Sequence, residues 1–135
     1  MADWETARAI AASLPGGEES TSYGQPAFKV RRRLFAWVSP DRAADGALAT
    51  YVDEAEKELL IDSQPELYFA TPHYDGYPIV LTRLELADSD VLRERIEDSW
   101  LLRAPKTLVD AYVAATSDGV RTTTTRSRRS RRSPL

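Results

Sequence analysis

The sequence predicts a single α+β domain in which an antiparallel sheet of about five strands carries helices on one face. Three observations predict this class. Segments with helical periodicity follow segments with alternating apolar residues, and the strand-like segments are joined mainly by short turns. The chain has 135 residues, of which 42% are hydrophobic, and such a chain can bury one core without disulfides.

The first predicted element is a helix over residues 4–14. Asp3 stands where a capping side chain is preferred, and Pro15 with two following glycines ends the helical pattern. Residues 18–25 are polar and favour a turn. The chain is therefore expected to enter its sheet only after residue 25.

Three strands are predicted next, at 26–30, 34–38 and 47–52. Apolar and charged or small side chains alternate in the first two, as in strands with one buried face. Three consecutive arginines, residues 31–33, lie between them. We therefore expect a hairpin with a basic tip, and we expect Trp37 in its second strand to be buried.

A second helix is predicted over residues 54–63. Asp53 can cap it, and Glu56 stands three residues on, which is the spacing of a capping box. Its apolar positions, Ala55 and Leu59, are expected to face the core. Pro65 ends the helical pattern.

Two more strands and two more helices complete the predicted domain. The strands cover 66–70 and 78–86 and are joined by a turn-rich segment. Asp88 or Ser89 caps the third helix, and Pro105 separates it from a fourth helix at 105–115. The third helix has a stripe at helical spacing made of Leu92, Ile96, Trp100 and Arg103. Trp100 is expected to be buried.

Charge divides the chain into two parts. Residues 1–116 hold 12 basic and 20 acidic residues, a net charge of −8, whereas residues 117–135 hold six arginines and one acid. The second part is low in complexity and nearly free of apolar side chains, so it is predicted to be a disordered basic tail on a folded domain of residues 1–116. The tail is either an incidental, solubilising end or an arm that binds polyanions.

Several classes of function are excluded by what the sequence lacks. It has no cysteine and no apolar run of membrane-spanning length, and it does not open on a basic and then apolar leader, so we expect a cytoplasmic protein. No phosphate-binding loop, dinucleotide-binding glycine pattern, serine-nucleophile elbow or zinc-protease motif is present. We therefore expect no catalytic residue, metal site or cofactor.

Two local patterns leave alternatives open. His73 is the one histidine, and Asp75 follows two residues later, so His73 is a general base, a partner contact or a structural hydrogen-bonding residue. The segment of residues 71–78, TPHYDGYP, combines aromatic side chains with prolines and either contacts a ligand or covers an end of the sheet. The acidic residues 53–62 are either a weak cation site or a solvated helix face.

Five segments together resemble the MmcQ/YjbR-like family: LPGGEES, YGQPAFKV, LFAWV, TPHYDGYPIVLTRL and DSWLLRAPKTLV. Their order and spacing match from about residue 4 to residue 116. The resemblance implies a compact fold similar to the CyaY-like arrangement and DNA binding through a "double wing" motif. It implies no catalytic residues. The chain departs from the pattern after Lys29, where three arginines replace the expected glycine or asparagine turn.

We therefore expect a non-enzymatic DNA-binding module that is monomeric and touches no membrane. Its expected phosphate contacts are Lys29, Arg31, Arg32, Arg33, Arg83 and Lys106. The alternative is a small-ligand or protein-interaction domain that uses the segment of residues 71–78. Its expected contacts are Tyr23, His73, Tyr74, Asp75 and Tyr77.

Overall fold

The computed structural model describes residues 3–119. Their contacts divide the chain after Ala104 into two compact units. The first unit is the α+β body, and the second contains helix α4 (Lys106–Gly119). The predicted basic tail lies outside the described residues from residue 120 onward, and α4 continues past the predicted boundary at residue 116.

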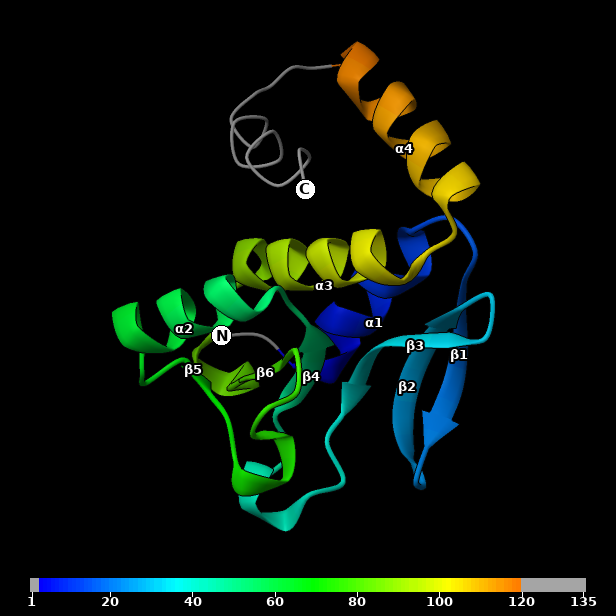
Figure 1. The fold of residues 1–135 in the computed structure, drawn as a ribbon. Helices are drawn as coiled ribbons and strands as arrows, with labels where there is room; N and C mark the ends of the chain where they lie inside the picture. The colour runs from blue at the N-terminus through cyan, green and yellow to red at the C-terminus, as the bar shows by residue number, and fades with distance from the viewer. Residues whose placement is uncertain (1–2, 120–135) are drawn as a thin grey trace. The chain divides into compact units, whose positions relative to one another are not determined.

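The body contains a six-stranded sheet in which every neighbouring pair is antiparallel (Figure 1). The strand order is β1-β2-β3-β4-β6-β5. The strands are β1 (Gly17–Ser22), β2 (Gln25–Val30), β3 (Arg33–Val38), β4 (Leu48–Tyr51), β5 (Tyr68–Phe69) and β6 (Ile79–Thr82). The helices of the body are α1 (Trp4–Ser13), α2 (Glu54–Ser63) and α3 (Ser89–Arg103). Single turns of 3-10 helix, η1 (Arg42–Ala44), η2 (Pro72–Tyr74) and η3 (Leu84–Leu86), lie in the connections.

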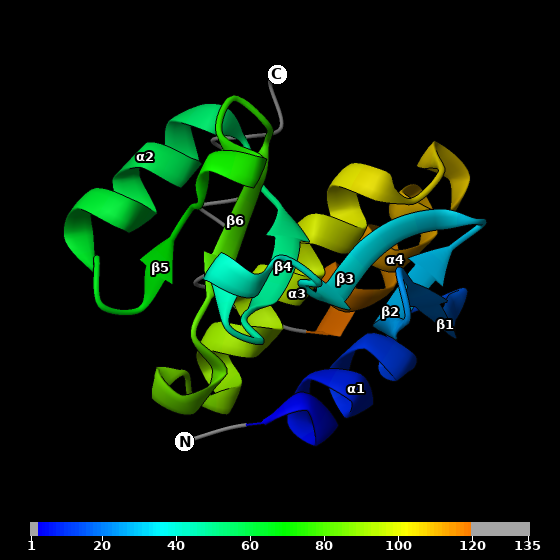
Figure 2. The ribbon, with the colours of Figure 1, turned by 90° about the horizontal axis from the view of Figure 1, so that it is seen from below.

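The two faces of the sheet are covered differently, as Figures 1 and 2 show. Helices α1 and α3 lie on one face, where the Phe28 ring contacts Trp4 of α1 and Phe35 of β3. The connections that hold η1 and η2 cover the opposite face, where Trp37 and Tyr74 belong to a second apolar cluster. The predicted fold class, an antiparallel α+β sheet with helices on one face, is confirmed.

Both tryptophans that the sequence places in the core are buried there. Trp37 belongs to the cluster under η1 and η2, whereas Trp100 of α3 faces α1 and donates its indole Nε1–H to the carbonyl oxygen of Pro15 at 2.9 Å. The capping predictions for α1 and α3 are also confirmed, because Asp3 accepts from the amide of Thr6 and Asp88 accepts from that of Val91. Among the described helices none is long and apolar enough to cross a membrane.

The strand β1 is absent from the sequence prediction, which places a turn over residues 18–25. Its sequence GEESTS is polar, yet it pairs with β2 along its whole length. It is an edge strand with much of its surface in water, so burial imposes no apolar alternation on it. Arg8 of α1 forms an ion pair with Glu19 of β1, and its Nε atom lies 2.7 Å from the Glu19 carboxylate. This pairing lowers the pKa of Glu19 below its usual value, mainly through the hydrogen bond from Arg8.

Helix α2 has the predicted bounds, but the face that it buries is opposite to the predicted one. Ala55 is exposed and Leu59 is 67% exposed, whereas Lys57 is only 6% exposed. The predicted capping box does not form, since Asp53 makes no side-chain cap bond and Glu56 turns to Arg95 of α3. Polar partners on neighbouring elements, rather than the few apolar residues of α2, therefore set its orientation.

Candidate functional site

The two-residue turn between β2 and β3 is formed by Arg31 and Arg32. Both have positive φ angles, 49° and 73°, and Val30 pairs with Arg33 across the turn. Positive φ at both central positions defines the tight hairpin turns that favour asparagine and glycine. An L-residue held in the left-handed region costs about 1–2 kcal/mol. The chain thus keeps two arginines where smaller residues are more stable.

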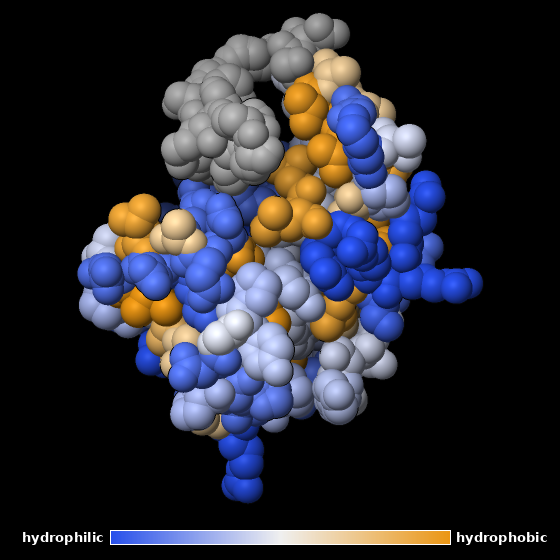
Figure 3. All heavy atoms as spheres, in the orientation of Figure 1, coloured by the Kyte–Doolittle hydropathy of each residue, from blue (hydrophilic) through white to orange (hydrophobic). Residues whose placement is uncertain are grey.

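The arginines at this turn are exposed and hold no acidic partner within residues 3–119. Arg31, Arg32 and Arg33 all face water, and no ion pair between described residues includes them. Figure 3 shows strongly hydrophilic side chains protruding on the side where Figure 1 places this turn. Lys29 is half-buried and lies opposite Glu18 in the β1–β2 register, so part of its charge is balanced. The free positive charge is therefore concentrated at residues 31–33.

Helix α3 fixes the root of this hairpin. The described β3–β4 register begins at Ala36, so the preceding carbonyls of β3 extend beyond the β4 ladder. The Ser99 hydroxyl donates to the carbonyl of Phe35 at 2.5 Å and accepts from the amide of Tyr51 at 2.9 Å. Arg103 donates its Nε–H to the carbonyl of Leu34 at 3.0 Å. The basic turn therefore stands on a strand that is tied to the longest helix of the body.

Arg103 is a cation that the sequence prediction treated only as part of a helical stripe. Its guanidinium carbon lies 4.1 Å from the centroid of the Tyr51 ring, and that ring lies 5.6 Å from the Trp37 ring. Its bond to Leu34 puts it one residue away from Arg33 along β3. The sequence indicates this role only through spacing, because Arg103 continues the apolar stripe of Leu92, Ile96 and Trp100 at helical spacing.

One predicted phosphate contact lies away from this turn, and another belongs to the second unit. Arg83 follows β6 and its guanidinium carbon lies 4.1 Å from the centroid of the Phe69 ring of β5, at the sheet edge remote from β2 and β3. Lys106 belongs to the second unit and pairs with Asp110 at 2.7 Å. The prediction that Arg83 extends the basic tip is therefore wrong, because the strand order separates it from β3.

Side chains outside the segment of residues 71–78 hold it in place through hydrogen bonds. Lys57 of α2 donates its Nζ–H groups to the carbonyls of Tyr74 and Tyr77, at 3.2 and 2.7 Å. The hydroxyls of Tyr74 and Ser39 share a hydrogen bond of 2.8 Å, and Thr71 donates to the Asp41 carboxylate at 2.5 Å. These anchors lie on helix α2 and on the connection between β3 and η1, so the segment is a rigid platform.

Only part of the predicted contact set lies on the surface of this platform. His73, Asp75 and Tyr77 are exposed, whereas Tyr74 is 5% exposed and belongs to the apolar cluster under the loop. Tyr74 is therefore a core residue, which corrects its predicted role as a surface contact. The His73 ring meets the Tyr74 ring edge-on at 4.7 Å, and no hydrogen bond within the described residues joins it to Asp75.

Tyr23 is separated from the basic tip by the length of β2. It forms the β1–β2 turn with Gly24, has a φ of 51° and is 90% exposed. Successive turns of an antiparallel meander lie at opposite ends of the shared strand. Tyr23 and the Arg31–Arg32 turn therefore cannot contact one phosphate together.

Removing the Lys57 anchor is expected to loosen the platform. A Lys57→Met variant removes the ammonium donor from the carbonyls of Tyr74 and Tyr77, which keep only the backbone amides of Tyr77 and Ile79. We expect a loss of about 1–3 kcal/mol in the free energy of unfolding. Urea denaturation measures this loss, and amide hydrogen exchange over residues 71–78 should quicken. Lys106→Met, at an exposed position, is the matched control and should change stability by about 0.5 kcal/mol or less. Equal effects of the two substitutions would contradict the anchoring role.

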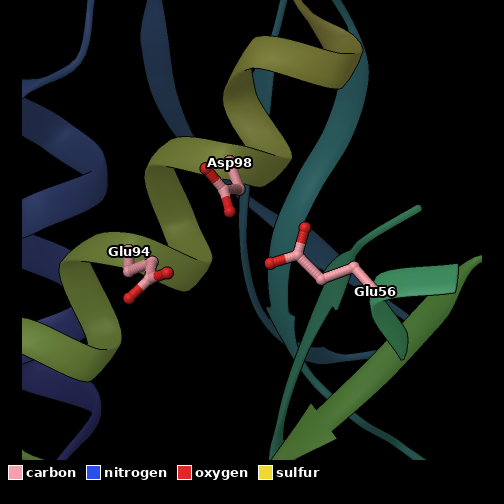
Figure 4. Close-up of side chains that lie close together, drawn as sticks. All are labelled: Glu56, Glu94 and Asp98. Atoms are coloured by element: carbon pink, nitrogen blue, oxygen red, sulfur yellow. The ribbon is translucent and has the colours of Figure 1, made fainter. Parts of the chain in front are cut away.

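An acidic cluster lies between α2 and α3 (Figure 4). Glu56 of α2 extends toward Glu94 and Asp98 of α3, and carboxylate oxygens of the three lie within 4.8 Å of one another. Arg95 is fully buried among them, with its Nη2 2.8 Å from Asp98, 3.4 Å from Glu56 and 3.7 Å from Glu94. A side-chain cation thus stands where a metal ion would have to bind.

The same cluster influences the sheet beneath it. Burial raises the pKa of the Tyr68 hydroxyl on β5, and the charge of Arg95 opposes this effect. Of the acidic residues that the sequence groups at 53–62, the cluster contains only Glu56. Arg95, Glu94 and Asp98 come from a different helix, so the cluster depends on how α2 and α3 pack. The contact between Arg95 and Glu56 links the two helices.

A comparison with solved structures shows the fold that this chain shares with a known protein. The solved structure of Deinococcus radiodurans protein DR2400, described as containing family-model domain DUF419, matches with a TM-score of 0.63 and 24% sequence identity. The match covers 76% of this chain and 78% of that chain, and at this identity it shows a shared fold.

The family follows from a closer match. The YjbR family model matches residues 12–102, and the chain belongs to this family. Uncharacterized protein Rv2570 of Mycobacterium tuberculosis and uncharacterized protein Mb2600 of Mycobacterium bovis are each 36% identical over 129 residues. Each match covers 84% of this chain and 98% of the relative. The resemblance seen in the sequence is therefore confirmed, and the names of these relatives assign no activity.

Proposed function

We propose that this protein is a non-enzymatic DNA-binding module that contacts phosphates through the β2–β3 turn. The observation that carries the proposal is the exposed pair Arg31–Arg32, held at positive φ with Arg33 beside it and no acidic partner in the described part of the chain. Backbone strain kept at exposed cations adds nothing to packing and is typical of functional positions. Contacts of Lys and Arg with phosphate supply most non-specific affinity for DNA.

The acidic character of the body is compatible with this function because the charges are segregated. The exposed acids of α2, Glu54, Glu58 and Asp62, belong to a helix that packs against β5 at the far edge of the sheet. In both views α2 lies on the side of the body opposite the β2–β3 turn (Figures 1 and 2). At physiological salt, exposed charges more than about 8 Å apart are largely screened. The charges of these three acids therefore act mainly away from the turn, whereas Glu18 of β1 lies close to it, opposite Lys29.

A double substitution tests the turn in two independent ways. Arg31→Asn with Arg32→Gly supplies the residues that such a turn prefers, so we expect the free energy of unfolding to rise by about 1–2 kcal/mol. The same change removes two phosphate contacts. In fluorescence anisotropy with a labelled DNA duplex, the full chain should then bind more weakly, and its log–log salt slope should shrink by about 1.8.

The control variant for this test also loses two positive charges, but at positions away from the turn. Arg42→Gln with Arg93→Gln removes two exposed arginines from η1 and α3, and this variant should keep the wild-type salt slope to within about 0.5. Any contribution of the six tail arginines is common to all three proteins. An unchanged slope in the turn variant, with its stability raised as expected, would contradict DNA binding by the turn.

A second candidate function is supported by the rigid platform of residues 71–78. Its anchors, Lys57 and the buried Tyr74, hold the exposed His73, Asp75 and Tyr77 in fixed positions. Rigid surface loops with exposed aromatic side chains are favourable contact sites, since little side-chain freedom is lost on binding. In this alternative the protein is a ligand- or protein-interaction domain, and DNA does not perturb the turn.

A further inference from the structure

We infer that Arg103 is a preorganised phosphate ligand that completes the DNA-contacting surface at the root of the β2–β3 hairpin. This inference rests on the proposed function and extends it to a residue on another element. The ligand class is a phosphodiester of the nucleic-acid backbone. Arg33, one residue from the carbonyl to which Arg103 donates, is the nearest of the three consecutive arginines along β3.

Two contacts fix the Arg103 side chain. Its Nε–H bonds to the Leu34 carbonyl at 3.0 Å, and its guanidinium carbon stands 4.1 Å from the centroid of the Tyr51 ring. The Tyr51 ring is itself held against Trp37, at a centroid distance of 5.6 Å. Stacking on an aromatic face and a bond at Nε together define both the position and the plane of the guanidinium group.

The forked end of Arg103 is open to a ligand. A guanidinium group has five N–H donors, and the Leu34 carbonyl uses the one on Nε. No ion pair or hydrogen bond between described residues engages the two Nη atoms, and neither is a buried atom without a partner. Arg103 as a whole is half-buried. The Nη atoms are therefore presented to solvent in the geometry that binds two oxygens of one phosphate.

The residues that hold the Arg103 side chain carry no negative side-chain charge. Leu34, Tyr51 and Ser99 are neutral, and Arg33 adds a second cation beside them. The nearest acid before Arg103 on α3 is Asp98, which is buried and paired with Arg95 at 2.8 Å. Ordering a long arginine side chain costs up to about 2 kcal/mol. The Arg103 side chain is already ordered in the folded protein. The side chains of Arg31 and Arg32, at the exposed tip, become ordered only when DNA binds.

Substitution of Arg103 should weaken DNA binding in a way that separates charge from geometry. Arg103→Gln removes one phosphate contact, so the anisotropy assay should show a salt slope smaller by about 0.9 and, near 0.1 M salt, an affinity about eightfold lower. Arg103→Lys keeps the charge and loses the fork and the Nε bond. It should bind severalfold more weakly with the wild-type slope.

Three further variants make the test decisive. Arg93 is an exposed arginine on the same helix, so Arg93→Gln and Arg93→Lys control for charge and should change affinity by less than about twofold. Tyr51→Leu removes the aromatic support without changing any charge, and it should weaken binding with the slope retained, even if the Arg103 variants fold poorly.

The outcomes distinguish this inference from the proposed function. Wild-type affinity in Arg103→Lys and Tyr51→Leu, with weaker binding and a smaller salt slope in Arg31→Asn/Arg32→Gly, would overturn the role of Arg103 and leave the turn in place. An unchanged salt slope in Arg31→Asn/Arg32→Gly would overturn the proposed function itself. Thermal unfolding of each variant confirms that a folded protein was measured.

Discussion

Replacing Arg95 by leucine is expected to lower the free energy of unfolding by about 3–5 kcal/mol. Arg95 is 0% exposed and is the cation among Glu56, Glu94 and Asp98. Without it, the carboxylates of Asp98 and Glu56 lose the Arg95 cation in a poorly hydrated space. The loss of one member of a buried ion pair costs far more than the net value of the pair, because the remaining charge keeps its desolvation penalty.

Urea denaturation of two companion variants identifies the cause. Arg93→Leu changes an exposed position on the same helix and should alter stability by about 0.5 kcal/mol or less. Arg95→Leu combined with Asp98→Leu removes both members of the closest pair, so it should recover a large part of the loss. A cost below about 1 kcal/mol for the single Arg95 variant would show that the cluster is hydrated and does not join α2 to α3.

Replacing Trp100 by alanine should produce a loss of similar size, about 3–5 kcal/mol. Trp100 is fully buried between α3 and the N-terminal part of the body, and its indole donates to the Pro15 carbonyl at 2.9 Å. The substitution therefore opens a cavity and leaves a carbonyl without its donor. The tie between α3 and the end of α1 is lost with it.

The matched control is Leu102→Ala, on the same helix but facing outward. This change should cost less than about 1 kcal/mol, since an exposed side chain leaves no cavity. Thermal unfolding followed by circular dichroism compares the two variants without relying on tryptophan fluorescence. An unchanged midpoint for Trp100→Ala would contradict the packing of α3 against α1.

The sequence predicts the elements that have a strong apolar period. Helices α1 and α3 and strands β2 to β4 bury a regular set of side chains, so their patterns and their capping residues are visible. Strand β1 has no such pattern, because pairing with β2 rather than burial defines it. The face of α2 is unpredictable for a similar reason: its most buried side chain, Lys57, is held by carbonyls of a distant loop.

The candidate site is predictable to the same extent. The place of residues 31–33 at a hairpin tip follows from local alternation and is confirmed, whereas the positive φ of Arg31 and Arg32 requires the paired strands. The separation of Arg83 from the turn depends on the order β4-β6-β5, which no local pattern encodes. Arg103 reaches Leu34, at the root of the hairpin, because α3 packs against β3 and β4.

DNA binding by the β2–β3 turn is tested most directly by titrating the isotope-labelled full chain with a short DNA duplex and following the backbone amide resonances. We expect the largest shifts at residues 29–34, with further shifts at Tyr51 and Arg103, all weakened by added salt. Shifts that are confined to residues 71–78, or to the basic tail beyond residue 119 while residues 29–34 stay unperturbed, would contradict it.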